Sequence, residues 1–251
     1  MRGRGAGRGR PAKKVVFSES HWSALPILVL GVAFVINFFG HCVVAKWFPT
    51  DRAEAYGFGS MVPDFALMAR SKLAKPATTD AAVADGIALH HRTDAAFHGL
   101  PVVLGLMREL GERLAAYGCA RGPARATGHI GIELLLDGEL ASDTSNAQAY
   151  ISALTTQSSV LRWDADDDVD GAAAMAQLHQ RLIAFGVPYD LARTDSIVHR
   201  LQRMLHDRPR LAPSAQDLLA MQRAIDDLRQ RCVVATPTVL RSLRAGLGLD
   251  T

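Results

Sequence analysis

Cysteine is scarce in this chain of 251 residues. Cys42, Cys119 and Cys232 are the only three, and they stand far apart without any paired motif. A disulfide framework or a zinc finger is therefore not indicated. A reducing cytoplasm is the simplest location for a protein with this cysteine usage.

Convincing runs of alternating β-branched residues are also missing, as are internal repeats. Helix formers dominate, Ala above all, and apolar residues recur at helical spacing almost throughout. We expect an all-α fold, a single multi-helix domain over residues 21–251, with a Gly-rich connection at Gly57 and Gly59 and a surface loop at 155–171. Helices are expected at about 22–47, 64–71, 80–96, 101–118, 124–140, 147–154, 172–185, 189–206, 214–232 and 236–246.

Acidic residues are absent from the first 14 positions, which carry six Lys or Arg. The net charge of +3 is therefore made of +6 on this segment and −3 on the rest. Residues 1–20 are expected to form a disordered basic N-terminal arm. Such an arm can touch nucleic acid or anionic lipid, but no nucleic-acid partner is expected.

Long apolar runs are limited to residues 24–36, thirteen positions that Pro26 interrupts and Asn37 and His41 follow. This run is short for a membrane-spanning helix, so we expect a buried core helix. Membrane association through residues 24–39 is the alternative.

Polar residues with metal-ligand chemistry lie in helices that otherwise look buried. His41 stands in the first helix, and His90 and Asp94 are four residues apart, on one helical face. A further such face carries His129, Glu133 and Asp137, and His91 and His98 flank the His90 segment. Imidazoles and carboxylates gathered inside an α-bundle can form a metal site. Hydrogen-bonded core histidines and exposed helical ion pairs are the alternative interpretation.

Phosphate-binding loops, nucleophile elbows and Ser/His/Asp arrangements are absent, but five short segments resemble those of a known family. They resemble, in order and with similar gaps, the acyl carrier protein phosphodiesterases, a divergent branch of the HD-type metal-dependent phosphohydrolases. The segments are 37–41 (NFFGH), 59–65 (GSMVPDF), 83–94 (VADGIALHHRTD) with Pro101, 133–137 (ELLLD) with Leu140, and 208–211 (RPRL).

This resemblance implies an HD-like helical bundle and a hydrolase that releases 4′-phosphopantetheine from holo acyl carrier protein, a reaction of fatty acid biosynthesis and lipid metabolism. It implies a divalent cofactor, manganese first, with Mg, Fe or Zn as alternatives. The implied metal ligands are His41, Asp64, His90, Asp94 and Asp137. Asp64 and Asp137 would orient the attacking water, and Arg92 would offset charge beside the metal. Arg208 and Arg210 would receive phosphate oxygens.

Two positions depart from the family pattern. Gly138 follows Asp137 where the family usually has a histidine, and His98 stands where an acid is common. A missing ligand can mean a catalytically weakened relative that binds metal or a partner, a substitute ligand such as His98 or His129, or a different substrate. A membrane-associated helical protein with incidental histidines is the remaining alternative.

Overall fold

Helices make up most of the residues that the structure, a computed structural model, describes, which are 38–167 and 169–249. These residues belong to one compact unit. The expected all-α bundle is therefore confirmed. The predicted basic arm at 1–20 and the apolar run at 24–36 lie outside the described residues.

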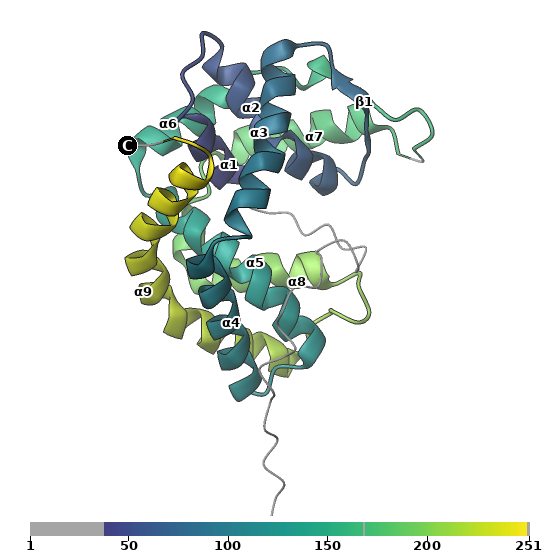
Figure 1. Cartoon of the computed structure of the whole chain (residues 1–251). Coiled ribbons are helices and arrows are strands. Elements are labelled where there is room, and N and C mark those ends of the chain that lie inside the picture. The colour runs from purple at the N-terminus through teal and green to yellow at the C-terminus, as the bar shows by residue number, and fades with distance from the viewer. Residues whose placement is uncertain (1–37, 168, 250–251) are drawn as a thin grey trace, which may run out of the picture. The chain divides into compact units, whose positions relative to one another are not determined.

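Four helices surround one hydrophobic cluster, in the upper half of Figure 1. Its largest fully buried members are aromatic, among them Phe39, Phe58 and Phe65. The helices are α1 (Phe38–Ala45), α2 (Ala53–Met68), α6 (Thr144–Ala153) and α7 (Gly171–Phe185).

A second hydrophobic cluster, rich in leucine, lies mainly between four other helices in the lower half of Figure 1. They are α4 (Pro101–Ala116), α5 (Arg121–Leu140), α8 (Thr194–Leu205) and α9 (Ala215–Gly246). Helix α3 (Ala81–Phe97) supplies Val83 to the first cluster and Leu89 and Phe97 to the second. Polar side chains of α1, α3 and α5 therefore meet near the junction of the two clusters.

The predicted Gly-rich connection at 57–59 is wrong, because α2 runs through it and through Pro63. Pro63 removes one helical hydrogen bond, the one to the carbonyl of Gly59. Close packing of α2 on α3 outweighs that loss. A Cβ on Gly59 would lie 2.3 Å from the carbonyl oxygen of Val83, and one on Gly86 would lie 2.3 Å from that of Tyr56. These glycines serve helix packing instead of a turn.

The predicted division of the last helix is also wrong, because α9 continues through Pro237. Thr236 Oγ1 donates a hydrogen bond to the carbonyl of Cys232 at 2.9 Å, one turn earlier. Apolar residues on both sides of the proline, including Leu228 and Val239, pack into the same cluster. The helix begins at a capping box formed by Ser214 and Asp217, and serine is a favoured residue at this N-cap position.

A small antiparallel sheet was not predicted. Strand β1 (Leu73–Thr78) pairs with β2 (Leu161–Trp163), which follows the 3₁₀ turn η3 (Ser158–Val160). Part of the expected surface loop at 155–171 is therefore a strand. The expected helix at 189–206 is likewise a 3₁₀ turn, η4 (Tyr189–Ala192), followed by α8.

Within the described residues, no helix has both the length and the apolar composition needed to cross a bilayer. Helix α1 is the described end of the helix expected at 22–47, and seven of its eight residues are buried.

Candidate metal centre

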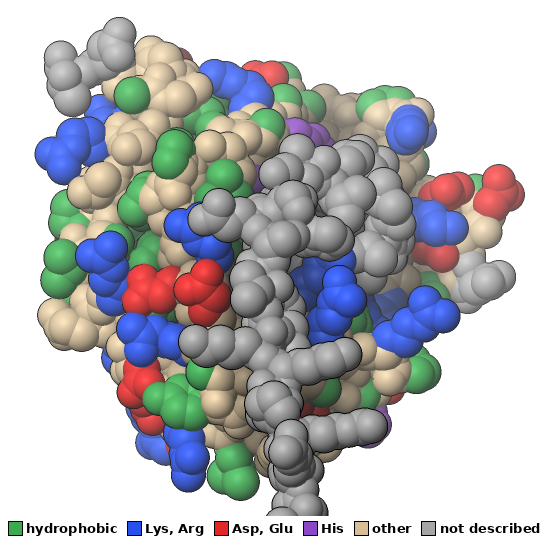
Figure 2. Space-filling view, turned by 60° about the horizontal axis from the view of Figure 1, so that its bottom comes forward, with side chains coloured by type: hydrophobic (Ala, Val, Ile, Leu, Met, Phe, Trp, Pro, Cys, Tyr) green, Lys and Arg blue, Asp and Glu red, His purple; other side chains and the backbone are tan. Residues whose placement is uncertain are grey.

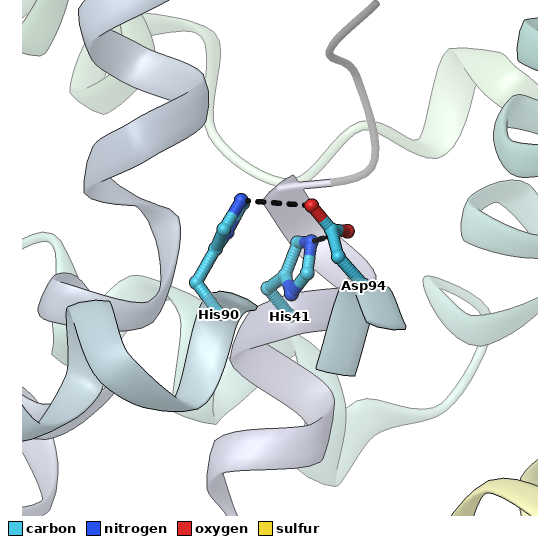
Figure 3. A group of neighbouring side chains, drawn as sticks. All are labelled: His41, His90 and Asp94. Carbon is cyan, nitrogen blue, oxygen red and sulfur yellow. Dashed lines mark ion pairs between the residues drawn. The ribbon is translucent and has the colours of Figure 1, made fainter. Parts of the chain in front are cut away.

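Two histidines and an aspartate from different helices converge at one point (Figure 3). His41 comes from α1, and His90 and Asp94 lie one turn apart on α3. Asp94 Oδ1 is 3.2 Å from His41 Nε2, and Asp94 Oδ2 is 3.3 Å from His90 Nε2. The two imidazole rings stack with their centroids 3.9 Å apart. One atom of each residue lies within 4.8 Å of the others.

The ring of His90 is oriented by a backbone carbonyl of α2. Its Nδ1 lies 2.9 Å from the carbonyl oxygen of Ser60. Because a carbonyl only accepts hydrogen bonds, Nδ1 carries the proton, and the lone pair of the neutral ring is on Nε2. Most metal-bound histidines have such a partner behind the ring. The close packing at Gly59 and Gly86 brings the Ser60 carbonyl to His90.

Asp64, a third predicted ligand, approaches the same imidazole from α2. Its Oδ1 is 3.7 Å from His90 Nε2, although Asp64 is not within 4.8 Å of the whole group. Its other oxygen, Oδ2, is buried without a hydrogen-bond partner among the described residues. Asp64 therefore lies beside the three converging residues. Its Oδ1 faces His90, and its Oδ2 has no hydrogen-bond partner among the described residues.

Asp137 lines a small cavity together with His41. Its Oδ1 accepts a hydrogen bond of 2.9 Å from the backbone N–H of Gly40, the residue before His41. The cavity has a volume of about 30 Å³, which is room for about one water or ion. His41, Asp94, Glu133 and Asp137 line one part of it, and Val239, Leu240 and Leu243 of α9 line another.

Burial and electrostatic interaction shift the pKa values of these groups in different directions. Burial lowers the pKa of His41 to about 4, so this ring is neutral at pH 7. Burial also disfavours charge on His90 and Asp94, but their interaction outweighs it. The carboxylates of Asp94 and Asp64 raise the pKa of His90, and the two imidazoles lower the pKa of Asp94. Burial raises the pKa of Asp64 and Asp137 well above the ordinary range.

The three converging residues fit a first-row divalent cation. Such an ion binds nitrogen and oxygen at roughly 2.0–2.2 Å, so ligand atoms around it stand roughly 3–3.5 Å apart. The separations of 3.2 Å from His41 Nε2 to Asp94 Oδ1 and 3.3 Å from His90 Nε2 to Asp94 Oδ2 lie in that range, each through a different oxygen. Three protein ligands leave coordination positions open, which is typical of catalytic rather than structural sites. Asp94 has 41% of its side chain exposed, so the group is accessible from that side.

The predicted arginines are not brought to this group. Arg92 donates a long hydrogen bond of 3.4 Å to the carbonyl of Leu247, and its guanidinium lies over the ring of Phe48. Arg208 and Arg210 lie in the turns between α8 and α9. The carbonyl of Arg210 packs against Gly122 at the start of α5. That point is roughly 16 Å along the helix from Glu133, at 1.5 Å per residue.

Gly138, where the family usually has a histidine, faces away from the cavity residues. A Cβ at this position would lie 2.8 Å from the carbonyl oxygen of Leu191 in η4 and 3.0 Å from the Leu191 side chain. The backbone of η4 therefore occupies the space that a side chain would need. In this chain position 138 is a packing contact and cannot supply a ligand.

A second group of candidate ligands forms between α5 and the end of α3. His98, His129 and Glu133 each offer one atom, and these atoms lie within 4.8 Å of one another. The sequence interpretation named these residues as candidates but placed none of them in the expected ligand set. Their signal is the four-residue spacing, since His90, Asp94 and His98 follow one another at that interval, as do His129, Glu133 and Asp137.

Ser60 is a functional candidate that sequence reasoning missed. Its contribution is a backbone carbonyl, and the identity of a side chain does not reveal where a backbone carbonyl will point.

No family model matches the chain, and no curated protein or solved structure matches it. The geometry of the site and the short motifs therefore carry the functional interpretation.

Proposed function

We propose that this protein is a metal-dependent phosphodiester hydrolase that acts on holo acyl carrier protein or on a related phosphopantetheinyl diester. The observation that carries the proposal is the convergence of His41, His90 and Asp94 from segments about 50 residues apart in the sequence. The same three positions match polar residues of the phosphodiesterase motifs. The substrate class rests on that resemblance.

His41, His90 and Asp94 would hold the cation, and the Ser60 carbonyl would keep His90 Nε2 directed at it. A bound divalent cation polarises a phosphoryl oxygen and lowers the pKa of water. Asp64 is the proton acceptor that the geometry favours, because its Oδ2 has no partner among the described residues and burial raises its pKa. Asp137, held by Gly40, would orient water in the cavity.

Access also supports the proposal. The exposed side of Asp94 gives a path from solvent to the group. Lys and Arg side chains lie among Asp and Glu side chains on the face shown in Figure 2. The role of Arg92 in offsetting charge and those of Arg208 and Arg210 in binding phosphate stay predictions, as does manganese as the metal.

Metal analysis tests the cation site first. We expect protein loaded with Mn²⁺ and then dialysed to retain the ion, and His90→Ala or Asp94→Asn to lower its affinity at least about tenfold. His199→Ala, which changes an exposed histidine, is the matched control and should bind as the native chain does. Equal binding by all four proteins would refute this cation site.

Mass spectrometry of holo acyl carrier protein then tests the reaction. The native chain with Mn²⁺ should convert the holo form to the apo form, with free 4′-phosphopantetheine as product. His90→Ala should lose this conversion and His199→Ala should keep it. Tight metal binding without cleavage of the carrier protein, or of a small chromogenic phosphodiester, would contradict the hydrolase proposal.

A catalytically weakened relative is the second candidate function. The observation that favours it is the packing of η4 against Gly138, which leaves no space for the histidine usual in the family. Such a protein would bind metal but give neither reaction product.

A further inference from the structure

Two imidazoles and one carboxylate form a second polar group next to the first. Glu133 Oε1 lies 3.2 Å from His129 Nε2 and 3.6 Å from His98 Nε2. The rings of His98 and His129 stack at a centroid distance of 4.8 Å and an angle of 17°. Both Nε2 atoms therefore lie near the same oxygen.

Hydrogen bonding explains only one of the two contacts between Glu133 and these histidines. The His129–Glu133 contact is an ordinary pair one helical turn apart. The His98–Glu133 separation of 3.6 Å is too long for a hydrogen bond. His98 Nδ1 is also buried without a hydrogen-bond partner among the described residues. Because two stacked imidazolium rings repel each other, protonation of both is disfavoured. A cation between the three atoms would accept a lone pair from each of them.

The charges of the buried carboxylates also favour a bound cation. Asp64, Glu133 and Asp137 are buried, and Asp94 stands half exposed beside them. Among residues 38–167 and 169–249, none of these four carboxylates forms an ion pair with Lys or Arg. Buried carboxylates need opposite charge or protonation. A divalent cation offsets the charge of about two ionised carboxylates.

The two groups lie within electrostatic reach of each other. The Asp94 carboxylate acts on the pKa of both His98 and His129, and His98 acts on that of His41. Glu133 and Asp94 also line the same cavity. Asp94 therefore belongs to the first group and lies within electrostatic reach of the second.

We propose that His98, His129 and Glu133 bind a second divalent cation, next to the group of His41, His90 and Asp94. The ligand set of two imidazoles and one carboxylate suits Zn, Fe or Mn and leaves positions open. The proposal concerns binding and does not depend on hydrolase activity.

Equilibrium dialysis against Mn²⁺ and Zn²⁺, followed by elemental analysis, tests this second site. The native chain should saturate at about two ions. His129→Ala and His98→Ala should each saturate at about one, and so should Glu133→Gln, which preserves the shape of the side chain. His199→Ala is the matched control and should bind as the native chain does.

Visible absorption of the Co²⁺-loaded proteins gives a readout independent of dialysis. The native chain should show two titration steps, and His129→Ala should show only the step that His90→Ala removes. Saturation of the native chain at about one ion, or an unchanged ion count in both His129→Ala and Glu133→Gln, would overturn the second site. Failure of the hydrolase proposal would appear instead as metal binding without cleavage of carrier protein.

Discussion

Buried carboxylates determine the energetics of the site at the scale of single residues. Asp137 has only 2% of its surface exposed, and burial raises its pKa well above the ordinary range. The N–H of Gly40 lowers that pKa in part but does not neutralise the charge. Without a cation, the folded chain therefore favours the protonated form of Asp137.

Replacement of Asp137 by an uncharged residue should reveal the free-energy cost of burying its carboxylate. The pKa of the folded state lies above that of the unfolded state, so the native chain binds more protons when folded. Its stability should decrease as pH rises from about 4 through the folded-state pKa. In chelator-treated protein, Asp137→Asn keeps the oxygen that accepts from Gly40 and carries no charge. We expect it to be more stable than the native chain at about pH 8 by on the order of 1–3 kcal/mol, with little difference at about pH 4.

Urea unfolding followed by circular dichroism at both pH values measures this difference. A variant that is less stable than the native chain at about pH 8 would show that the Asp137 charge is compensated in the metal-free fold.

Contact between two helices determines how the site is built at the scale of elements. Gly59 and Gly86 let the backbones of α2 and α3 approach so closely that each Cβ would meet a carbonyl at 2.3 Å. This approach brings the Ser60 carbonyl to His90 Nδ1 and Asp64 to His90 Nε2. Helix packing and ligand orientation therefore depend on the same glycines.

Substitution of Gly86 should disturb both the packing of α2 on α3 and the orientation of His90. Because the neighbour is backbone, an added Cβ has to separate the helices, and Gly86→Ala should lower the free energy of unfolding by about 1–3 kcal/mol. It should also weaken Mn²⁺ binding. Gly105→Ala, in α4, is the control, since a Cβ there would meet nothing within 4 Å. It should stabilise the chain by about 0.5–1 kcal/mol. Denaturant unfolding and dialysis measure both effects, and equal stability of the two variants would contradict the helix-packing interpretation.

The site joins two hydrophobic clusters at the scale of the whole described unit. His41 comes from a helix whose aromatic residues pack in the first cluster, and Glu133 from a helix that packs in the second. A cation held by His41, His90 and Asp94 would bind the folded chain and not the unfolded one, and would therefore stabilise the fold.

Thermal unfolding should respond to metal accordingly. At a Mn²⁺ concentration 100 times Kd, the folded state should gain about 2.7 kcal/mol, and a chelator should remove this gain. His90→Ala should show a smaller increase in Tm with Mn²⁺, and His199→Ala the full increase. Scanning calorimetry with and without chelator makes the measurement. An equal Tm in both conditions for the native chain would contradict a native-state cation site.

Local patterns predicted much of the fold, and the motif resemblance named His41, His90 and Asp94, which converge in the structure. Helical spacing of apolar residues placed α3, α4, α5 and α7 to within a few residues. The same patterns were wrong at Gly57–Gly59, Pro63 and Pro237. Glycine and proline usually interrupt helices, but here tertiary packing outweighs their local preference.

The sequence by itself determined the helical class and the ladders of polar side chains, because both depend on a spacing of four residues along one helix. Only the tertiary structure decided that His41 meets His90 and Asp94 while Arg92 turns away, and that His98 and His129 share Glu133. Those outcomes depend on how closely helices far apart in the sequence approach one another. Between α2 and α3, Gly59 and Gly86 permit that closeness.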